Sequence, residues 1–172
     1  MIRHRLAAAC ACAAALTLAV LAVSSEALAD EHSTIKLPGD HPRYAFEAEP
    51  HLIVGYGDPF FPNGLPGGGF RGTFHIANGF IKNINDSVGI GVGIDFATNG
   101  HLVVPVVLQW NFWLSNHWSV FGEPGLAVGG GGPNPTVGPA LFLGGRYHFN
   151  DTVALTLRVG FPEIGIGVSF LL

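Results

Sequence analysis

The chain has 172 residues, of which 48% are hydrophobic and 12% charged, and its formal net charge at pH 7 is −4. This length suits one domain rather than two, and the acidic balance disfavours nucleic acid as a partner. The 25 glycines, together with many Val, Ile, Leu and Phe residues and few helix formers, favour an all-β fold.

Residues 1–29 have the pattern of a secretory signal peptide. Two arginines precede an apolar stretch from Leu6 to Val23, and small residues stand at Ala27 and Ala29, the two positions that a signal peptidase reads. A retained membrane helix is the competing interpretation, because roughly 18 apolar residues are near the lower limit for crossing a bilayer. The small residues favour cleavage after Ala29, which would also remove both cysteines and leave an exported chain without disulfides.

Residues 30–42 are polar and aperiodic, and we expect a flexible periplasmic lead-in there, followed by a barrel domain of residues 43–172. Throughout that domain apolar residues alternate with small or polar ones, which predicts strands with two different faces. The clearest example is 87–97, where Val, Ile and Phe alternate with Gly, Ser and Asp. We predict eight strands: 43–57, 68–77, 87–97, 102–114, 117–129, 139–149, 152–159 and 164–172.

The connections between these strands alternate in length. Tight turns are expected at 83–86, 115–117 and 150–151, and longer connections at 58–67, 97–101, 129–136 and 160–163. Short periplasmic turns and longer external loops are typical of an up-and-down antiparallel transmembrane β-barrel. Pro50, Pro105 and Pro124 fall inside predicted strands of a barrel without free edges, so we expect β-bulges at these prolines.

The polar face of the strands decides between a soluble and a membrane barrel. It carries small residues and few long charged ones, whereas a water-facing surface would carry many more Lys and Glu. Eight strands leave a lumen that side chains fill, so paired charges are expected inside rather than an open pore. The predicted lumen charge cluster is Glu47, Glu49, Arg71, Asp95, Glu123, Arg146 and Arg158, with His51, His75 and His148 on the same face.

The apolar face is expected to contact lipid. Aromatic residues near the predicted strand ends would form the girdle that meets the lipid headgroups: Tyr44, Tyr56, Trp110, Trp118, Tyr147 and Phe149. Two soluble alternatives remain open, a β-sandwich with these aromatics in its core and a periplasmic barrel that binds a small apolar ligand.

On these patterns the mature chain resembles the small outer-membrane β-barrel proteins, the OmpA-like and OmpX-like class, over nearly its whole length. The most specific element is the last strand, where Ile164, Ile166, Val168, Phe170 and Leu172 share one face. The family usually ends in an aromatic residue, whereas this chain ends in Leu172. The resemblance implies insertion into outer-membrane lipid by the barrel assembly machinery, which would read the strand from Ile164 to Leu172. We expect a structural or surface-display role without enzymatic activity or cofactor.

A lipid-modifying enzyme is the second functional hypothesis. Lipid A deacylases use a histidine, a serine and a carboxylate on the barrel wall, and His117, Ser119 and Glu123 share one strand face. That face is predicted to line the lumen, away from lipid, and Glu123 lies roughly 13 Å beyond Ser119 along the strand. Catalysis by these three residues is therefore disfavoured.

The histidines raise the question of a metal site. His32, His41 and His51 lie near the start of the mature chain, but no pair of histidines has the close spacing of a preformed site. We therefore predict no metal site from the sequence.

Overall fold

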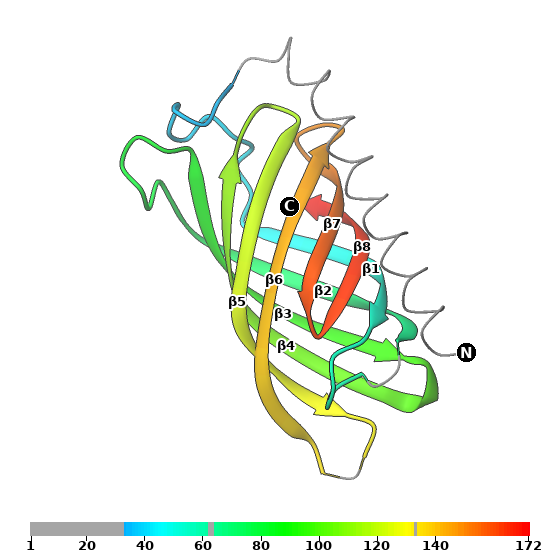
Figure 1. Ribbon diagram of the computed structural model, residues 1–172. Helices are drawn as coiled ribbons and strands as arrows, with labels where there is room; N and C mark the ends of the chain where they lie inside the picture. The colour runs from blue at the N-terminus through cyan, green and yellow to red at the C-terminus, as the bar shows by residue number, and fades with distance from the viewer. Residues whose placement is uncertain (1–32, 62–63, 133) are drawn as a thin grey trace, which may run out of the picture. The chain divides into compact units, whose positions relative to one another are not determined.

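The computed structural model describes residues 33–61, 64–132 and 134–172. Their strands form one closed barrel in which every strand pairs with its neighbours in chain order (Figure 1). The predicted all-β, eight-stranded, up-and-down fold is confirmed. The strands are β1 (Phe46–Gly55), β2 (Leu65–Asn78), β3 (Asp86–Ala97), β4 (His101–Trp113), β5 (Trp118–Gly130), β6 (Thr136–His148), β7 (Val153–Phe161) and β8 (Glu163–Leu171), with a short 3-10 turn, η1 (Thr98–Gly100), between β3 and β4.

Closure comes from the pairing of the first strand with the last. β1 and β8 are antiparallel, with Glu47 opposite Leu171 at one end and Gly55 opposite Glu163 at the other. Pairing of this kind leaves no strand with unpaired backbone groups along an edge. The connections after β1, β3, β5 and β7 lie at one end of the barrel, called the loop end below, and the connections after β2, β4 and β6 lie at the other, the turn end.

The signal-peptide prediction concerns residues 1–29, which lie outside the described residues. In the part of the chain that the structure does describe, no helix has the length and apolar character needed to cross a membrane.

Residues 33–42 were expected to be a flexible lead-in. In the structure they are hydrogen-bonded to the turn end of the barrel. The Thr34 N–H donates to the Leu114 carbonyl at 3.0 Å, and the Asn85 N–H donates to the Ile35 carbonyl at 2.8 Å. The Asn85 side chain, fully buried, donates to the Asp40 carbonyl at 2.8 Å. Buried amide groups need such partners, and the backbone of the lead-in supplies them.

The prediction of β-bulges at Pro50, Pro105 and Pro124 is wrong. Beside each proline the ladder to one neighbour skips two pairs and then resumes in the same register: β1–β8 beside Pro50, β3–β4 beside Pro105 and β4–β5 beside Pro124. A missing N–H donor thus opens one side of the ladder locally, while the pairing on the other side continues. Among the strand pairs described, the register shifts between His75 and Ala77 of β2 instead.

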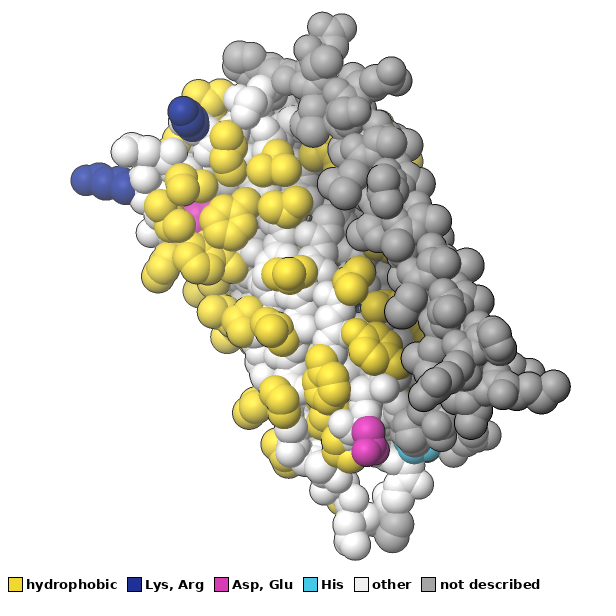
Figure 2. All heavy atoms as spheres, viewed as in Figure 1, with side chains coloured by type: hydrophobic (Ala, Val, Ile, Leu, Met, Phe, Trp, Pro, Cys, Tyr) yellow, Lys and Arg dark blue, Asp and Glu magenta, His cyan; other side chains and the backbone are white. Residues whose placement is uncertain are grey.

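The two faces of the barrel wall differ sharply in chemistry. Outward positions expose large apolar side chains, for example Leu52 and Leu143 at 67% each and Phe74 at 60%. Figure 2 shows such hydrophobic side chains spread over the wall on the face in view. The inward positions are buried and include most of the charged residues of the strands. This distribution is the reverse of that in a water-soluble protein, where large exposed apolar patches are rare.

Candidate functional site

The barrel interior is filled by three layers of side chains. An apolar layer lies at the loop end, a charged layer in the middle, and an aromatic layer at the turn end. The charged layer holds the ionisable side chains that could bind a ligand or take part in a reaction. The other two layers separate it from the openings of the barrel.

The apolar layer comes from a loop that folds inward. Phe60 and Phe61, in the connection after β1, are fully buried and belong to a cluster with Ile53 and Phe142. A Cβ atom at Gly55 would lie 2.3 Å from the Phe61 ring, so a glycine at this position makes room for it. Sequence reasoning placed this segment in an outer loop. The two adjacent phenylalanines could have indicated a buried segment, since exposing both rings to water would be costly.

The charged layer is centred on Arg158. Its Nη1 lies 2.5 Å from Glu49 Oε1, and its Nε lies 2.8 Å from Glu123 Oε2. Arg71 shares the second carboxylate, with Nη1 at 2.9 Å from Glu123 Oε2, and Gln109 donates to Glu123 Oε1 at 2.9 Å. Glu123 therefore bridges two guanidinium groups, as a buried carboxylate requires if its charge is to be compensated.

A second ion pair lies nearer the turn end. Arg146 Nη2 is 2.6 Å from Glu47 Oε1, and the Arg146 guanidinium lies 4.3 Å from the centroid of the Phe121 ring. The Arg158 guanidinium lies over the same ring at 5.3 Å, so Phe121 interacts with two cations. The ring fits because its neighbour is Gly144, where a Cβ atom would lie 2.1 Å from it.

All members of the predicted lumen charge cluster are buried inside the barrel, and each has an oppositely charged partner in the same layer. His51 and His148 are buried there too, whereas His75 is half-buried at the turn end. Sequence reasoning missed Glu163, which it placed in a loop; this side chain is 1% exposed and points inward. Strand alternation could have predicted its direction, because Glu163 continues the inward series of Gly165, Gly167 and Ser169.

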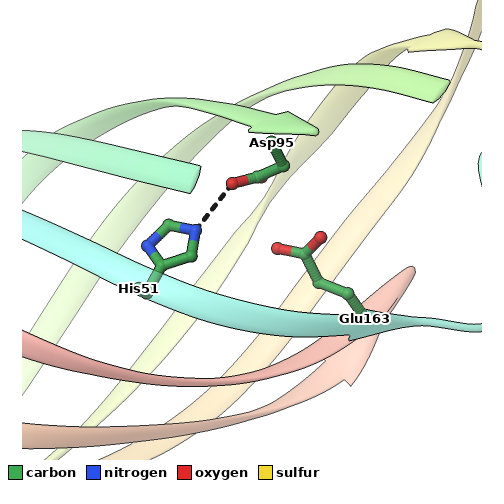
Figure 3. Close-up of side chains that lie close together, drawn as sticks. All are labelled: His51, Asp95 and Glu163. Carbon is green, nitrogen blue, oxygen red and sulfur yellow. Dashed lines mark hydrogen bonds and ion pairs between the residues drawn. The ribbon is translucent and has the colours of Figure 1, made fainter. Parts of the chain in front are cut away.

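A second group of polar side chains meets on the loop-end side of the charged layer. His51 Nε2 lies 2.6 Å from Asp95 Oδ1, and Glu163 points toward both (Figure 3). One donor atom from each of the three lies within 4.8 Å of the others. His51 and Asp95 can meet because Gly69 stands between them, opposite His51 in one ladder and Asp95 in the next. A Cβ atom there would lie 2.1 Å from Asp95 Oδ1.

The aromatic layer closes the turn end. It includes Tyr44, so the prediction that this residue belongs to the outer aromatic girdle is wrong. The ring of Tyr44 lies edge-on to the buried Trp113 at 6.5 Å and to His75 at 5.1 Å, inside rather than on the lipid face. Tyr44 precedes β1, which begins at Phe46, so strand alternation does not govern its direction. Burial raises the pKa of the Tyr44 phenol to about 12, and the negative charge of Glu47 adds to this shift.

The other predicted girdle residues lie outside the interior layers. Trp118, Tyr147 and Phe149 form a chain of ring contacts at the turn end, with centroid distances of 5.0 Å and 5.3 Å. Trp110 lies at the same end, where its ring contacts Phe80 at 5.7 Å, while Tyr56 follows β1 at the loop end. The aromatic rings are therefore concentrated near the turns.

The structure does not bring the three candidate catalytic residues together. Ser119 Oγ is hydrogen-bonded to His148 Nε2 at 2.9 Å, whereas His117 is exposed and stacks on Tyr147. Glu123 is held by Arg71 and Arg158. The Nδ1 of His148 has no hydrogen-bond partner among the described residues, so the serine–histidine pair lacks the carboxylate of a catalytic triad.

Comparison with known proteins supports the architecture and no specific activity. Neither protein-family models nor curated proteins match this sequence. Among solved structures, a chain described as "De novo design of transmembrane beta-barrels" is similar, with a TM-score of 0.58 and 13% identity over 77% of this chain and 99% of that one. At this identity the likeness shows a shared fold, the closed β-barrel.

Proposed function

We propose that this protein is an outer-membrane β-barrel of the OmpA-like and OmpX-like class, with a structural or surface-display role and no catalytic activity. Export would use residues 1–29 as a cleaved signal peptide. The observation that carries the proposal is the inverted polarity of the barrel, with paired charges inside and large apolar side chains exposed outside.

The exposed apolar residues need a solvent other than water. Leu52, Leu143 and Phe74 are each at least 60% exposed on the outer wall, and similar residues occur on every strand. An outward apolar band flanked by aromatic rings is the arrangement that lipid-facing barrel walls adopt. Outer-membrane lipid is therefore the partner that the outer surface fits best.

The filled interior favours a structural role over conduction. Phe60 and Phe61 occupy the loop end, Trp113 and Tyr44 the turn end, and the ion-paired layer lies between them. The same filling argues against a soluble barrel for an apolar ligand, because the space such a ligand would need holds buried charges instead. The separated positions of His117, Ser119 and Glu123 argue against lipid modification.

The experiment that tests this proposal combines cell fractionation with gel electrophoresis. We expect the protein in the outer-membrane fraction, and we expect unheated samples in mild detergent to migrate differently from boiled ones because the barrel stays folded. A water-soluble periplasmic protein without this heat-dependent shift would contradict the proposal. To test the enzyme alternative, lipid A from cells with Ser119→Ala and from wild-type cells would be compared by mass, and we expect no difference.

A further inference from the structure

The charged layer contains more acid than base. Among the described residues, five carboxylates are buried inside the barrel wall, and three arginines accompany them. Asp86, also buried, is excluded because it lies at the start of β3 and accepts a hydrogen bond from the outward-facing Trp110. Counted with every carboxylate ionised and both buried histidines uncharged, the interior has two more negative than positive charges, which is costly in a region removed from water unless bound protons or a cation compensate it. The carboxylates are Glu47, Glu49, Asp95, Glu123 and Glu163, and the arginines are Arg71, Arg146 and Arg158.

The excess is located at Asp95 and Glu163. The other three carboxylates each have an arginine nitrogen within 2.9 Å. Asp95 and Glu163 share only Arg71 Nη2, at 3.6 Å and 3.7 Å, which is beyond hydrogen-bonding distance. Asp95 Oδ2 and Glu163 Oε2 have no hydrogen-bond partner among the described residues, although both side chains are almost completely buried.

His51 completes this group with a nitrogen ligand that is already oriented. Its Nδ1 lies 3.2 Å from the backbone carbonyl oxygen of Glu49, to which an Nδ1–H can donate, and its Nε2 faces Asp95 and Glu163. A hydrogen bond from one ring nitrogen to a backbone carbonyl is the usual support of a metal-ligating histidine, because it fixes the tautomer and leaves the other nitrogen free to coordinate.

From these observations we propose that His51 Nε2 and one carboxylate oxygen from each of Asp95 and Glu163 bind a divalent transition-metal ion of the Zn²⁺ type. Imidazole nitrogen and carboxylate oxygen are ligands of Zn²⁺, with bonds of about 2.0–2.2 Å. The donor atoms already lie within 4.8 Å of one another. The ion would replace the proton between His51 and Asp95, and His51 Nε2 and Asp95 Oδ1 would separate from 2.6 Å to about 3.3 Å, the spacing of two ligands on a tetrahedral ion with bonds of about 2.0–2.1 Å. A dication also cancels the excess charge of the interior.

Glycines in the neighbouring strands leave space for His51, Asp95 and Glu163 to meet. Glycines flank His51 in both neighbouring strands, Gly69 in β2 and Gly167 in β8. A Cβ atom at Gly69 would lie 2.7 Å from His51 Nε2, and one at Gly167 would lie 2.8 Å from His51 Cβ. Any larger residue at Gly69 would occupy the space between the imidazole and the carboxylates.

The experiment measures zinc bound to the full chain purified in detergent, by equilibrium dialysis and elemental analysis. We expect one Zn²⁺ per barrel, and an affinity weakened about tenfold or more by Glu163→Gln, which removes one ligand charge at almost constant volume. His148→Gln is the matched control, because it alters the other buried histidine of the interior and leaves the three ligands intact. The heat-dependent gel shift verifies that each variant is folded.

X-ray absorption of the zinc-loaded wild-type protein makes the test independent of any variant. We expect one imidazole nitrogen and carboxylate oxygens at about 2.0–2.2 Å. Less than a tenth of an equivalent of zinc, equal affinity in Glu163→Gln, or a spectrum with no imidazole or with several would each overturn the proposal. None of these readouts depends on the membrane in which the barrel resides, so failure here would leave the proposed function standing.

Discussion

Single glycines determine which interior side chains can meet. The Phe121 ring lies beneath two arginines only because residue 144 is glycine, where a Cβ atom would lie 2.1 Å from the ring. We expect Gly144→Ala to displace Phe121 and to lower the free energy of unfolding by about 1–3 kcal/mol, as overpacking does in other cores.

Urea unfolding followed by tryptophan fluorescence, with the barrel in detergent micelles, measures this difference. Gly122→Ala is the matched control, because its added methyl group would meet only the end of Leu143, at 3.7 Å. Equal stability of the two variants would show that Phe121 is not confined as described.

The phenol of Tyr44 should report its burial through its ionisation. Its pKa is raised to about 12 from an ordinary value of 10.0. Between these two values an unfolded chain loses the Tyr44 proton while the folded barrel keeps it, so stability falls as pH rises through this range. Ultraviolet absorbance of phenolate should show a titration step near pH 12 that is missing from Tyr44→Phe. Identical high-pH titrations of the two proteins would contradict the interior position of this ring.

At the scale of elements, the strands could be predicted because each has two chemically different faces. In β3 every second residue is Val, Ile or Phe, and its predicted bounds of 87–97 differ from Asp86–Ala97 by one residue. The charged layer followed from the same alternation. Glu163 was missed because the connection after β7 is the single residue Pro162, far shorter than its glycine and proline content suggested. Phe60 and Phe61 were missed because tertiary packing, not periodicity, folds their loop inward.

That inward-folded loop should contribute strongly to stability. Phe61→Ala empties a fully buried position in the apolar layer, so we expect a loss of about 3–5 kcal/mol in the free energy of unfolding. Phe80→Ala removes the same side chain from the connection after β2, where Phe80 is 71% exposed, and it should lower the free energy of unfolding much less. The temperature at which the folded gel band disappears compares the two variants, and equal temperatures would contradict a structural role for the loop.

The last strand is the element through which we expect assembly into the membrane. Phe170 is the aromatic residue nearest the C-terminus and is 41% exposed on the outer face of β8, while Ile164, on the same face, is 39% exposed. We expect Phe170→Ala to lower the folded fraction in cells severalfold, because the proposed membership of the outer-membrane barrel class implies an assembly machinery that reads an aromatic residue near the end. Ile164→Ala, which removes similar outward surface, should have a smaller effect. Equal folded fractions would argue against recognition of this strand.

For the molecule as a whole, each face of the barrel wall requires its own solvent. The attraction within ion pairs such as Arg158–Glu49 is strong inside because the wall keeps water away from them, and the exposed Leu and Phe residues are tolerated outside only if lipid covers them. A protein with these two faces in water would aggregate through its outer wall. The fold and the proposed location therefore support each other through the same residues.

Spin labels in proteoliposomes measure this solvent directly. A label at Leu143, in the middle of an outer strand face, should collide often with oxygen dissolved in the bilayer and rarely with a water-soluble nickel complex. A label at Asn116, exposed in the turn after β4, should show the opposite preference. If the label at Leu143 met the nickel complex as often as the label at Asn116 does, the outer wall would face water and the membrane-barrel account would be wrong.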